Sequence, residues 1–292
     1  MNYRKTVHLY RKLNNMTRIE NKDCNVFLQT IDDGVVDLVL TDPPYIISQD
    51  SGMEKHYNNI MNSTSSKTEE EWMLYSEKND DEIKKILKSS EYTLEKFKKN
   101  YTKYGSIYGK KYAVKTNYGE WDSSFTMEKL EKTIELYYKK LRKGGTVIIF
   151  FDLWKITLLK DLLEKYKFKQ IRMIEWIKTN PQPRNSKINY LTNAREIALL
   201  AVKGGKPTFN TKYHKGIFEY PIANKNRTHP TQKNIDLIKE LITIHSNKGD
   251  TVVDTFLGSG TTIFACMDTD RLCMGCELDK EYYNTITERL KK

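Results

Sequence analysis

The sequence predicts a doubly wound α/β fold, in which a mostly parallel sheet is interrupted once by a mainly helical insertion. Short apolar strands alternate with amphipathic helices over residues 17–45 and again over residues 126–290. Between these stretches, residues 46–118 are rich in Ser, Asn and Lys and lack that alternation. Near the C-terminus, a strand turns through two glycines into a helix, as at the ligand-binding edge of many parallel sheets. A chain of 292 residues is long enough to bury the core of such a domain.

The first two predicted strands flank a short amphipathic stretch. A strand is followed by a polar turn at Asn21-Lys22-Asp23 and by the amphipathic stretch from Val26 to Ile31. Asp32-Asp33-Gly34 then turns the chain into a second strand, over residues 35–40, which runs directly into Asp42-Pro43-Pro44-Tyr45. Because proline lacks the amide hydrogen that a sheet ladder needs, the two prolines end this strand.

We expect residues 46–118 to form an insertion with two amphipathic helices. Apolar residues recur at helical spacing in two groups, around Ile83 and around Phe97. Between residues 84 and 115 there are ten lysines against two glutamates, interleaved with tyrosines. Alternating basic and aromatic residues are typical of contact with a nucleic-acid backbone, but they also fit helices with an aromatic core and solvated lysines. The sequence leaves both interpretations open.

From residue 126 the α/β alternation resumes and continues to the C-terminus. The pair Gly144-Gly145 is predicted to stop the first helix of this part. The predicted helices span residues 126–142, 153–166, about 229–245, 260–268 and 280–290. The predicted strands span residues 146–151, 171–177, 196–202, 251–254 and 272–277, and a polar loop covers residues 203–226.

The composition favours an acidic partner. Lys plus Arg is 49 and Asp plus Glu is 38, which gives a formal net charge of +11. Excess positive charge favours contact with phosphate, because each neutralised phosphate releases counterions, although a solvated basic surface has the same composition. The first 25 residues lack an apolar centre, no apolar run is long enough to cross a membrane, and four cysteines make no disulfide framework. We therefore expect a reduced, cytoplasmic protein without membrane contact.

The segment that follows Asp254 has the form of a nucleoside-binding turn. The strand that ends there turns through Gly258 and Gly260 into a helix N-terminus, where the backbone can approach a ligand closely and amides point outward. Glu277 ends the next strand, 23 residues later, where a carboxylate can accept hydrogen bonds from both ribose hydroxyls. Ile263 replaces the third glycine of the dinucleotide fingerprint, which favours a nucleoside without a pyrophosphate. An ordinary strand-to-helix turn is the alternative interpretation.

The tetrapeptide Asp42-Pro43-Pro44-Tyr45 follows a buried strand and is expected to face the same crevice. Proline fixes its own φ and biases the residue before it, so the backbone carbonyls here are aimed rigidly. A carboxylate, a carbonyl and an aromatic face together suit a planar ring with an exocyclic amine, which offers two N–H donors and a π-face. A proline turn with a surface tyrosine is the plainer alternative.

Asp42–Tyr45 followed much later by Asp254–Thr262 resembles the amino-DNA methyltransferases that use S-adenosylmethionine, in their β-type (permuted) motif order and their adenine-N6 (DPPY) branch. The similarity covers about residues 17–45 and 119–292. Further matches follow in the family's order: Trp121-Asp122, Leu141–Gly145, Trp176–Pro181, Glu196 and His229–Lys233. An ordered series of this kind is far more specific than any single motif.

The resemblance implies a Rossmann-like methyltransferase sheet with one antiparallel strand. The implied division is a catalytic domain over residues 1–45 and 119–292, an insertion over residues 46–118 that is a candidate for DNA contact, and a candidate target-recognition loop over residues 203–226. Thr255 and Asn234 occupy positions at which the family usually has Pro. Because neither side chain carries the implied chemistry, we expect altered loop stiffness and not lost activity.

The resemblance also implies roles for single residues. The catalytic set would be Asp42, Pro43, Pro44 and Tyr45: the target amine would donate to the Asp42 carboxylate and the Pro43 carbonyl, and the flipped-out base would stack on Tyr45. Asp23 would contact the adenine end of S-adenosylmethionine, and Glu277 its ribose. The other cofactor-binding residues would be Asp42, Asp254, Phe256, Gly258, Ser259, Gly260, Thr261 and Thr262, with His229, Thr231 and Lys233 closing the pocket near the cofactor's carboxylate. No metal is expected.

We therefore expect a site-specific DNA adenine N6-methyltransferase, a monomer or homodimer beside the nucleoid, with a cognate restriction endonuclease as a candidate second partner. Cytosine-N4 methylation is the nearest alternative, in a branch that usually carries Ser where this chain has Asp42. Relatives that methylate RNA or protein glutamine usually carry Asn there. An inactive methyltransferase scaffold that only binds nucleic acid is the alternative from another class, and the presence of Asp42, Glu277 and the glycine turn argues against it.

Cys273 and Cys276 form a CxxC pair without a matching second pair. Because residues three apart in a strand point to opposite faces, the two sulfurs should not converge on a metal. We expect both to be buried thiols.

Overall fold

The computed structural model describes residues 17–45, 66–89, 92–109, 125–181, 191–222 and 232–291. The chain separates into two compact units, one formed by residues 1–46 with residues 121–292 and the other by residues 47–120. These limits lie close to the predicted ends of the insertion. DNA contact by the insertion stays a prediction.

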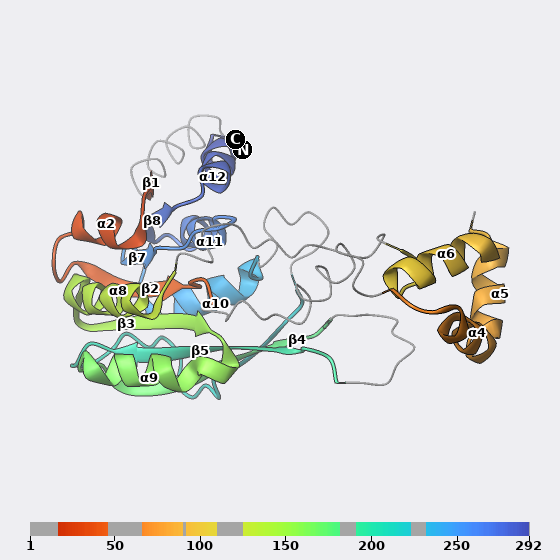
Figure 1. The fold of residues 1–292 in the computed structure, drawn as a ribbon. Helices are drawn as coiled ribbons and strands as arrows, with labels where there is room; N and C mark the ends of the chain where they lie inside the picture. Colours follow the sequence, from red (N-terminus) through yellow and green to blue (C-terminus); the bar gives the residue numbers. More distant parts are fainter. Residues whose placement is uncertain are drawn as a thin grey trace, which may run out of the picture. The chain divides into compact units, whose positions relative to one another are not determined.

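The larger unit is built on an eight-stranded sheet in the part of the chain that is described (Figure 1). Its strands are β1 (Thr17–Asn21), β2 (Val36–Thr41), β3 (Leu141–Phe151), β4 (Lys169–Lys178), β5 (Arg195–Val202), β6 (Ile217–Tyr220), β7 (Thr251–Asp254) and β8 (Leu272–Glu277). Their order is β1-β8-β7-β2-β3-β5-β4-β6. Neighbouring strands run parallel except that β5 is antiparallel to both β3 and β4. The predicted α/β class and its single antiparallel strand are confirmed.

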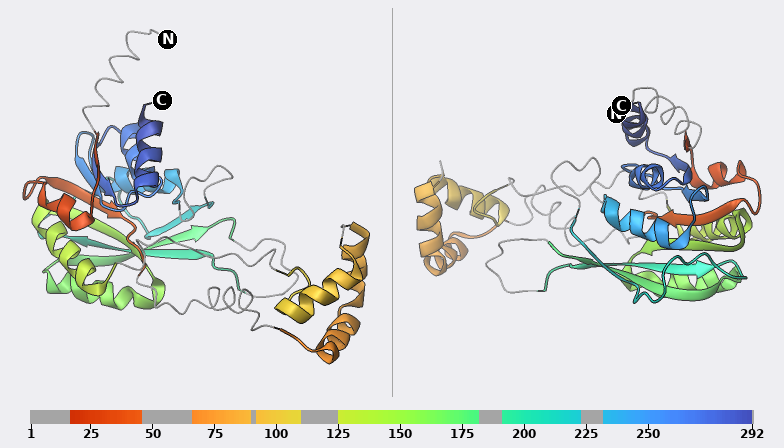
Figure 2. Two further views of the ribbon diagram at one scale, coloured as in Figure 1. Left: turned by 45° about the horizontal axis from the view of Figure 1, so that its top comes forward. Right: turned by 180° about the vertical axis from the view of Figure 1, so that it is seen from behind.

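Helices cover both faces of this sheet. They are α2 (Cys24–Gln29), α8 (Met127–Lys140), α9 (Ile156–Lys165), α10 (Ile235–His245), α11 (Thr261–Asp268) and α12 (Lys280–Leu290), and the 3-10 turn η1 (Leu153–Lys155) precedes α9. Ile134 of α8 and Leu163 of α9 belong to the core on one face, together with residues of α2. Leu241 of α10 and Ile263 of α11 belong to the core on the other face. Figure 2 shows α8 beside α9 and α10 beside α11. The fold is therefore doubly wound, as the alternation predicts.

The pair Gly144-Gly145 does not stop a helix, which corrects the prediction. Helix α8 ends at Lys140 and β3 begins at the next residue, so both glycines lie inside the strand. Gly144 has a φ of +80°, and a Cβ atom there would lie 2.3 Å from the carbonyl oxygen of Lys206. The glycine is needed for this close backbone approach, which the sequence alone cannot distinguish from a helix stop.

Residues 203–226 are not simply a loop, because they contain β6. This strand pairs in parallel with β4 and buries Phe218 in the core. The next helix also begins later than predicted: α10 is capped by Asn234, whose side chain accepts a hydrogen bond from the amide of Asp236 at 2.8 Å. Asn234, which stands where the family usually has Pro, therefore serves as a helix cap.

The smaller unit contains three helices among its described residues, where two were predicted: α4 (Glu69–Lys78), α5 (Asp80–Ser89) and α6 (Leu94–Tyr104). Trp72, Ile83, Phe97 and Ile107 form its core. Helix α4 escaped prediction because Trp72 is its one buried residue and its neighbours Met73 and Leu74 are exposed, so it has no apolar stripe at helical spacing. Phe97 lies in this core with Tyr92, Tyr101 and Tyr108 packed against it, and phosphate contact by the lysines between them stays a prediction.

Candidate active site

The predicted catalytic and cofactor-binding segments follow the ends of adjacent strands. β2 pairs in parallel with β7, with Val39 opposite Val253. β2 ends at Thr41 and β7 ends at Asp254, and the Thr41 hydroxyl donates a hydrogen bond to Oδ1 of Asp254 at 2.7 Å. The two segments are thus tied together directly at the carboxyl edge of the sheet, where ligands of such sheets bind.

The Asp254 carboxylate holds the glycine-containing turn from inside. Besides the bond from Thr41, it accepts hydrogen bonds from the amide of Phe256 at 3.0 Å and from the hydroxyl of Thr262 at 2.6 Å. The side chain is buried, which raises the pKa of its carboxyl, while these hydrogen bonds oppose the rise. Asp254 therefore shapes the turn, and its direct contact with a cofactor stays a prediction.

Both glycines of this turn have positive φ, +49° at Gly258 and +78° at Gly260. A Cβ atom at Gly260 would lie 3.1 Å from Ile286 of α12 and 3.3 Å from the ring of Phe264. A larger residue there would strain the turn and press on α12 before it narrowed any space for a ligand. The hydroxyls of Ser259 and Thr261 are hydrogen-bonded to each other at 2.9 Å.

Glu277 ends β8, the neighbour of β7, and its carboxylate is anchored by two backbone amides. Oε2 accepts from the amide of Gly258 at 2.7 Å, and Oε1 accepts from the amide of Asp279 at 2.8 Å. Burial raises the pKa of Glu277, and these two hydrogen bonds oppose the rise. Since each carboxylate oxygen has a second lone pair, the rigidly held group can still accept hydrogen bonds from two hydroxyls.

The catalytic candidate Asp42 has one oxygen bonded and one free in the described structure. The ammonium of Lys233 donates a hydrogen bond to Oδ2 of Asp42. Oδ1 is buried and has no hydrogen-bond partner among the described residues. Such an acceptor is costly to leave unpaired, and it is therefore a candidate acceptor for an N–H group of a ligand. Pro43 and Pro44 are both buried beside it.

Lys233 is a buried lysine at the centre of a charge chain that was not predicted from the sequence, and its two carboxylate partners, Asp42 and Glu196, are 22% and 23% exposed. It also forms an ion pair with Glu196 at 2.9 Å, and Glu196 forms another with Lys178 at 2.7 Å. Glu196 and Lys178 were noted only as matches to the family. The signal that could have joined them is their position, since Lys178 ends β4 and Glu196 begins its antiparallel neighbour β5.

The pKa directions follow from burial set against these ion pairs. Burial raises the pKa of Asp42 and the charge of Glu196 adds to the rise, while Lys233 and a hydrogen bond from the Tyr45 hydroxyl only partly oppose it. For Lys233, burial would lower the pKa, but the charges of Asp42 and Glu196 outweigh it and hold the pKa well above the ordinary value. For Glu196, burial would raise the pKa, but the two lysines outweigh it and lower it. Of the two carboxylates in this charge chain, Asp42 is thus the one whose ionised form is less stabilised.

This geometry differs from the role that the resemblance implied for Lys233. That role placed the side chain near the carboxylate of the cofactor, whereas the structure places its ammonium between Asp42 and Glu196. Lys233 is therefore paired with the candidate catalytic residue Asp42. The two residues predicted to act with it, His229 and Thr231, lie outside the described residues.

Two phenylalanines at the end of β3 connect that strand to the site. The ring of Tyr45 meets that of Phe151 edge-on, with centroids 6.1 Å apart and planes at 64°. On the other face of the sheet, Nζ of Lys233 lies 5.1 Å from the ring centroid of Phe150. Burial and the charge of Asp42 raise the pKa of Tyr45 well above its ordinary value, so its hydroxyl stays protonated.

Asp23 and Phe256 have local partners of their own. Asp23 caps α2, accepting from the amide of Asn25 at 2.9 Å, and its carboxylate pairs with Lys129 at 2.6 Å. The ring of Phe256 packs edge-on against Phe125, with centroids 5.1 Å apart. The predicted cofactor contacts of Asp23 and Phe256 stay predictions.

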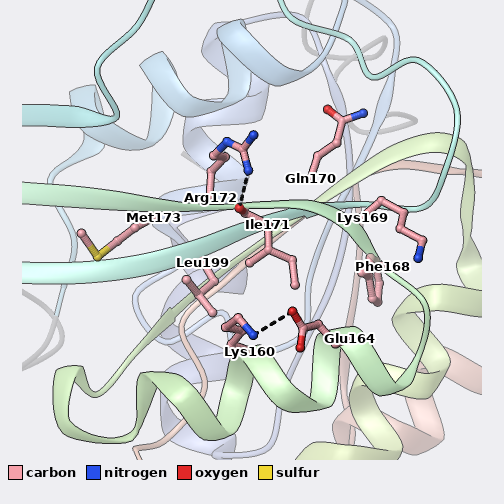
Figure 3. A pocket seen from close by; sticks show the side chains of 9 residues that line it. All are labelled: Lys160, Glu164, Phe168, Lys169, Gln170, Ile171, Arg172, Met173 and Leu199. Carbon is pink, nitrogen blue, oxygen red and sulfur yellow. Dashed lines mark hydrogen bonds and ion pairs between the residues drawn. The ribbon is translucent and has the colours of Figure 1, made fainter.

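Two other features lie away from this edge. Cys273 and Cys276 are buried free thiols on opposite faces of the sheet, as predicted. An open pocket lies between α9 and the first half of β4 (Figure 3). None of the predicted site residues line it, so it is not the expected crevice.

A profile of the DNA methylase family matches residues 36–288 of this sequence. The chain belongs to this family of DNA methylases. It is a DNA methyltransferase, and S-adenosylmethionine is its cofactor. A type II methyltransferase of Streptococcus pneumoniae, M2.DpnII, is 33% identical over 199 residues, which are 61% of this chain and 74% of that protein. M2.MboI of Moraxella bovis is 28% identical over 291 residues and covers 92% of this chain and 88% of that protein.

Solved DNA methyltransferase structures share this fold. The crystal structure of M1.HpyAVI in complex with its cofactor has a TM-score of 0.57 at 24% identity, over 94% of this chain and 100% of that one. The cytosine-N4-specific PvuII DNA methyltransferase has a TM-score of 0.60 at 14% identity, over 94% of this chain and 86% of that one. Among the described residues of the DNA methyltransferase, no helix is both long and apolar enough to cross a membrane.

The site residues of this DNA methyltransferase fit the cofactor. The anchored carboxylate of Glu277 retains acceptor capacity for ribose hydroxyls, and the turn beside it is formed by glycines with positive φ. Asp42, at the end of the adjacent strand pair, offers a free acceptor oxygen on the substrate side. The structure thus brings the predicted nucleoside-binding turn and the candidate acceptor for the target amine to one edge of the sheet.

Proposed function

We propose that this DNA methyltransferase methylates the N6 amine of an adenine that has left the duplex. The observation that carries the proposal is the buried, unpartnered Oδ1 of Asp42 at the end of β2. An exocyclic amine has two N–H donors, and Asp42 with the backbone carbonyl of Pro43 supplies two acceptors. Tyr45 supplies the ring on which the extrahelical base stacks, which offsets part of the unpairing cost of a few kcal/mol.

S-adenosylmethionine supplies an electrophilic methyl group when it is bound. Glu277 holds the ribose hydroxyls, and the glycine turn after Asp254 forms the wall of the pocket. The amine lone pair of adenine is delocalised into its ring and is a poor nucleophile. Hydrogen bonds to Asp42 and to the Pro43 carbonyl localise that lone pair and orient it, and positioning of this kind lowers a barrier by several kcal/mol.

Lys233 acts on this reaction through Asp42. Its ammonium stabilises the ionised carboxylate, which can accept a hydrogen bond from the amine, whereas a protonated carboxyl is a poorer acceptor. Methylation leaves one excess proton on the nitrogen, and Oδ1 of Asp42 is the acceptor placed to hold that proton before it passes to water. Glu196 and Lys178 keep the ammonium in position through their own ion pairs.

The aspartate supports adenine over cytosine. In the resemblance on which the assignment rests, the cytosine-N4 branch usually has Ser at this position, and this chain has Asp42. Both bases carry an exocyclic amine, so the choice depends on that residue and on the shape of the base pocket. A finding of N4-methylcytosine as the product would overturn this part of the proposal.

DNA contact outside the pocket is assigned to the insertion over residues 46–118 and to the target-recognition segment over residues 203–226. In the insertion, Lys96, Lys99 and Lys103 are exposed and share one face of α6, opposite the side that buries Phe97. Lys98 is on another side of the helix and pairs with Glu69 at 2.6 Å. The exposed face, called here the α6 lysine face, can meet phosphate, and Nζ of Lys96 and of Lys103 also lie over the rings of Tyr92 and Tyr104. A restriction endonuclease partner and a monomeric or dimeric state complete the proposal.

The test is expression in cells that lack N6-adenine methylation, followed by sequencing of their DNA with modified-base detection. The expected result is N6-methyladenine at one short recurrent sequence in cells with the wild-type protein. Cells with Asp42→Ala should show none, and cells with Glu288→Ala, a surface change on α12, should match the wild type. Unmodified adenine with the wild-type protein, at normal expression and cofactor binding, would contradict the proposal.

A further inference from the structure

The side chain of Trp154 is 88% exposed, which is unusual for the residue with the largest apolar surface. The other tryptophans in the described ranges, Trp72 and Trp176, are 6% and 2% exposed. Trp154 therefore exposes its indole to water, whereas Trp72 and Trp176 bury theirs. Because single exposed apolar residues are common on protein surfaces, the place of Trp154 in the fold decides what its exposure means.

Trp154 lies three residues after the end of β3, inside the 3-10 turn η1, whose hydrogen bonds fix its backbone. Asp152 caps this turn: its side chain accepts a hydrogen bond from the amide of Trp154 at 2.9 Å, and its carbonyl accepts one from the amide of Lys155 at 3.0 Å. The exposed indole is thus presented by a fixed backbone, which reduces the entropy that binding has to overcome.

The position of the turn places Trp154 at the active edge of the sheet. Phe150 and Phe151, the last two residues of β3, contact Lys233 and Tyr45 of the site. In register, Ile149 of β3 lies opposite Thr41, the residue before Asp42. The chain therefore passes from contact with the catalytic residues to the exposed indole within a few residues.

We propose that Trp154 contacts DNA beside the target base and stacks on a base that becomes exposed when the adenine leaves the duplex. This inference rests on the proposed function for its location but predicts a DNA contact that is measurable without catalysis. A flat aromatic side chain suits a nucleic-acid base, because every base has a π-face.

A second copy of the chain or another protein fits this surface less well. Leu153 and Leu158 are the large apolar residues exposed nearest to Trp154 in sequence, at 51% and 44%. A stable protein interface needs about 800 Å² of buried surface on each partner, which is far more than one indole and two leucines provide. A single aromatic residue that stacks on a base needs no such area.

The experiment measures duplex affinity by fluorescence anisotropy, using an oligonucleotide that carries the sequence found modified in cells. Trp154→Ala should weaken this affinity by about 5- to 150-fold, the range for loss of one base–aromatic stack. Trp154→Phe should restore most of it, and S-adenosylmethionine affinity should match the wild type in all variants. Met173→Ala is the matched control, because it removes a side chain that is 55% exposed and lies on β4 among the residues of the open pocket.

A second measurement locates the contact. With 2-aminopurine in place of the target adenine, binding should raise the fluorescence of the wild-type complex, and Trp154→Ala should reduce that rise. Duplex affinity and fluorescence of Trp154→Ala within two-fold of the wild type would overturn the proposal. So would a change of oligomeric state in sedimentation with duplex affinity unchanged. If the wild-type protein binds duplex but methylates cytosine, the proposed function fails while the anisotropy result still decides the role of Trp154.

Discussion

The two sides of the active edge hold their carboxylates by different means. On the cofactor side, Asp254 and Glu277 accept hydrogen bonds from neutral donors, which are backbone amides and the hydroxyls of Thr262 in the turn and Thr41 at the end of β2. On the substrate side, Asp42 is held by a buried ammonium that is itself shared with Glu196. The cofactor side is thus built from fixed dipoles, and the substrate side from a chain of charges.

This difference predicts how each side fails. Fixed dipoles tolerate the loss of one member, because the remaining hydrogen bonds still hold the turn. A buried ion pair fails more abruptly, because removal of one partner leaves an uncompensated charge at a cost of about 3–5 kcal/mol. Substitutions on the substrate side should therefore affect chemistry strongly with little effect on cofactor binding, and those on the cofactor side should do the reverse.

The largest effect is expected for Asp42→Ala. The single-turnover rate constant for methyl transfer should fall by about 10²- to 10³-fold, as it does when one preorganised hydrogen-bonding group is removed from an active site. Affinity for S-adenosylmethionine, measured by calorimetry, should stay within a few-fold of the wild type. A transfer rate near that of the wild type would show that the carboxylate does not act on the amine.

The reverse pattern is expected for Glu277→Ala. Loss of the charged acceptor for the ribose should weaken cofactor affinity by about 10- to 100-fold in calorimetry. At saturating cofactor, methyl transfer should recover most of its rate. Glu277→Gln keeps one acceptor oxygen, so its cofactor affinity should lie between those of the wild type and Glu277→Ala. Glu288→Ala on the surface of α12 is the control. Wild-type cofactor affinity in Glu277→Ala would place the ribose elsewhere.

Two variants of Tyr45 distinguish the role of its ring from that of its hydroxyl. Tyr45→Ala should reduce methyl transfer by about 5- to 150-fold, because it removes the face on which the base stacks. Tyr45→Phe keeps the ring and its edge contact with Phe151 and loses only the hydroxyl that is hydrogen-bonded to Asp42, so its transfer rate should fall far less than that of Tyr45→Ala. Equal losses in the two variants would show that the hydroxyl, and not the ring face, does the work.

The smallest effect on catalysis is expected from the α6 lysine face. Changing Lys96, Lys99 and Lys103 together to Gln should flatten the slope of log affinity for duplex DNA against log salt by about 0.9 for each phosphate that the variant no longer neutralises. Cofactor affinity should not change. The matched control is Lys248→Gln, which removes an exposed lysine that pairs with Asp270 in the larger unit. A slope equal to that of the control would mean that these lysines are only solvated.

Much of the fold could be predicted because its elements have strong local patterns. The strands at residues 251–254 and 272–277 and the helix at residues 280–290 match the structure to the residue, since apolar strands and capped helices are encoded locally. The wrong helix stop at Gly144-Gly145 has a cause that is not local. Gly144 sits inside a strand because the backbone of Lys206 comes close to it, and no local pattern reveals a contact so distant in sequence.

The site shows the same limit. Asp42 and Glu277 could be found because each ends a strand beside a proline or glycine motif. The link from Lys233 through Glu196 to Lys178 joins three separate segments of the chain, and its members come together only once β4 and β5 pair. The sequence therefore predicted a role for Asp42 and a separate role for Lys233, but not the ion pair between them.

The most direct test of this contrast is the pH dependence of single-turnover methyl transfer, measured beside that of cofactor affinity. The ionised form of Asp42 is the active one and its pKa is raised, so transfer should fall as the pH is lowered through that pKa. Lys233→Met removes the cation that opposes the rise, so the fall should move to higher pH. Glu196→Gln removes an anion that adds to the rise, so the fall should move to lower pH. The pH profile of cofactor affinity should be the same in all three proteins, whereas coincident pH profiles of methyl transfer would contradict the account.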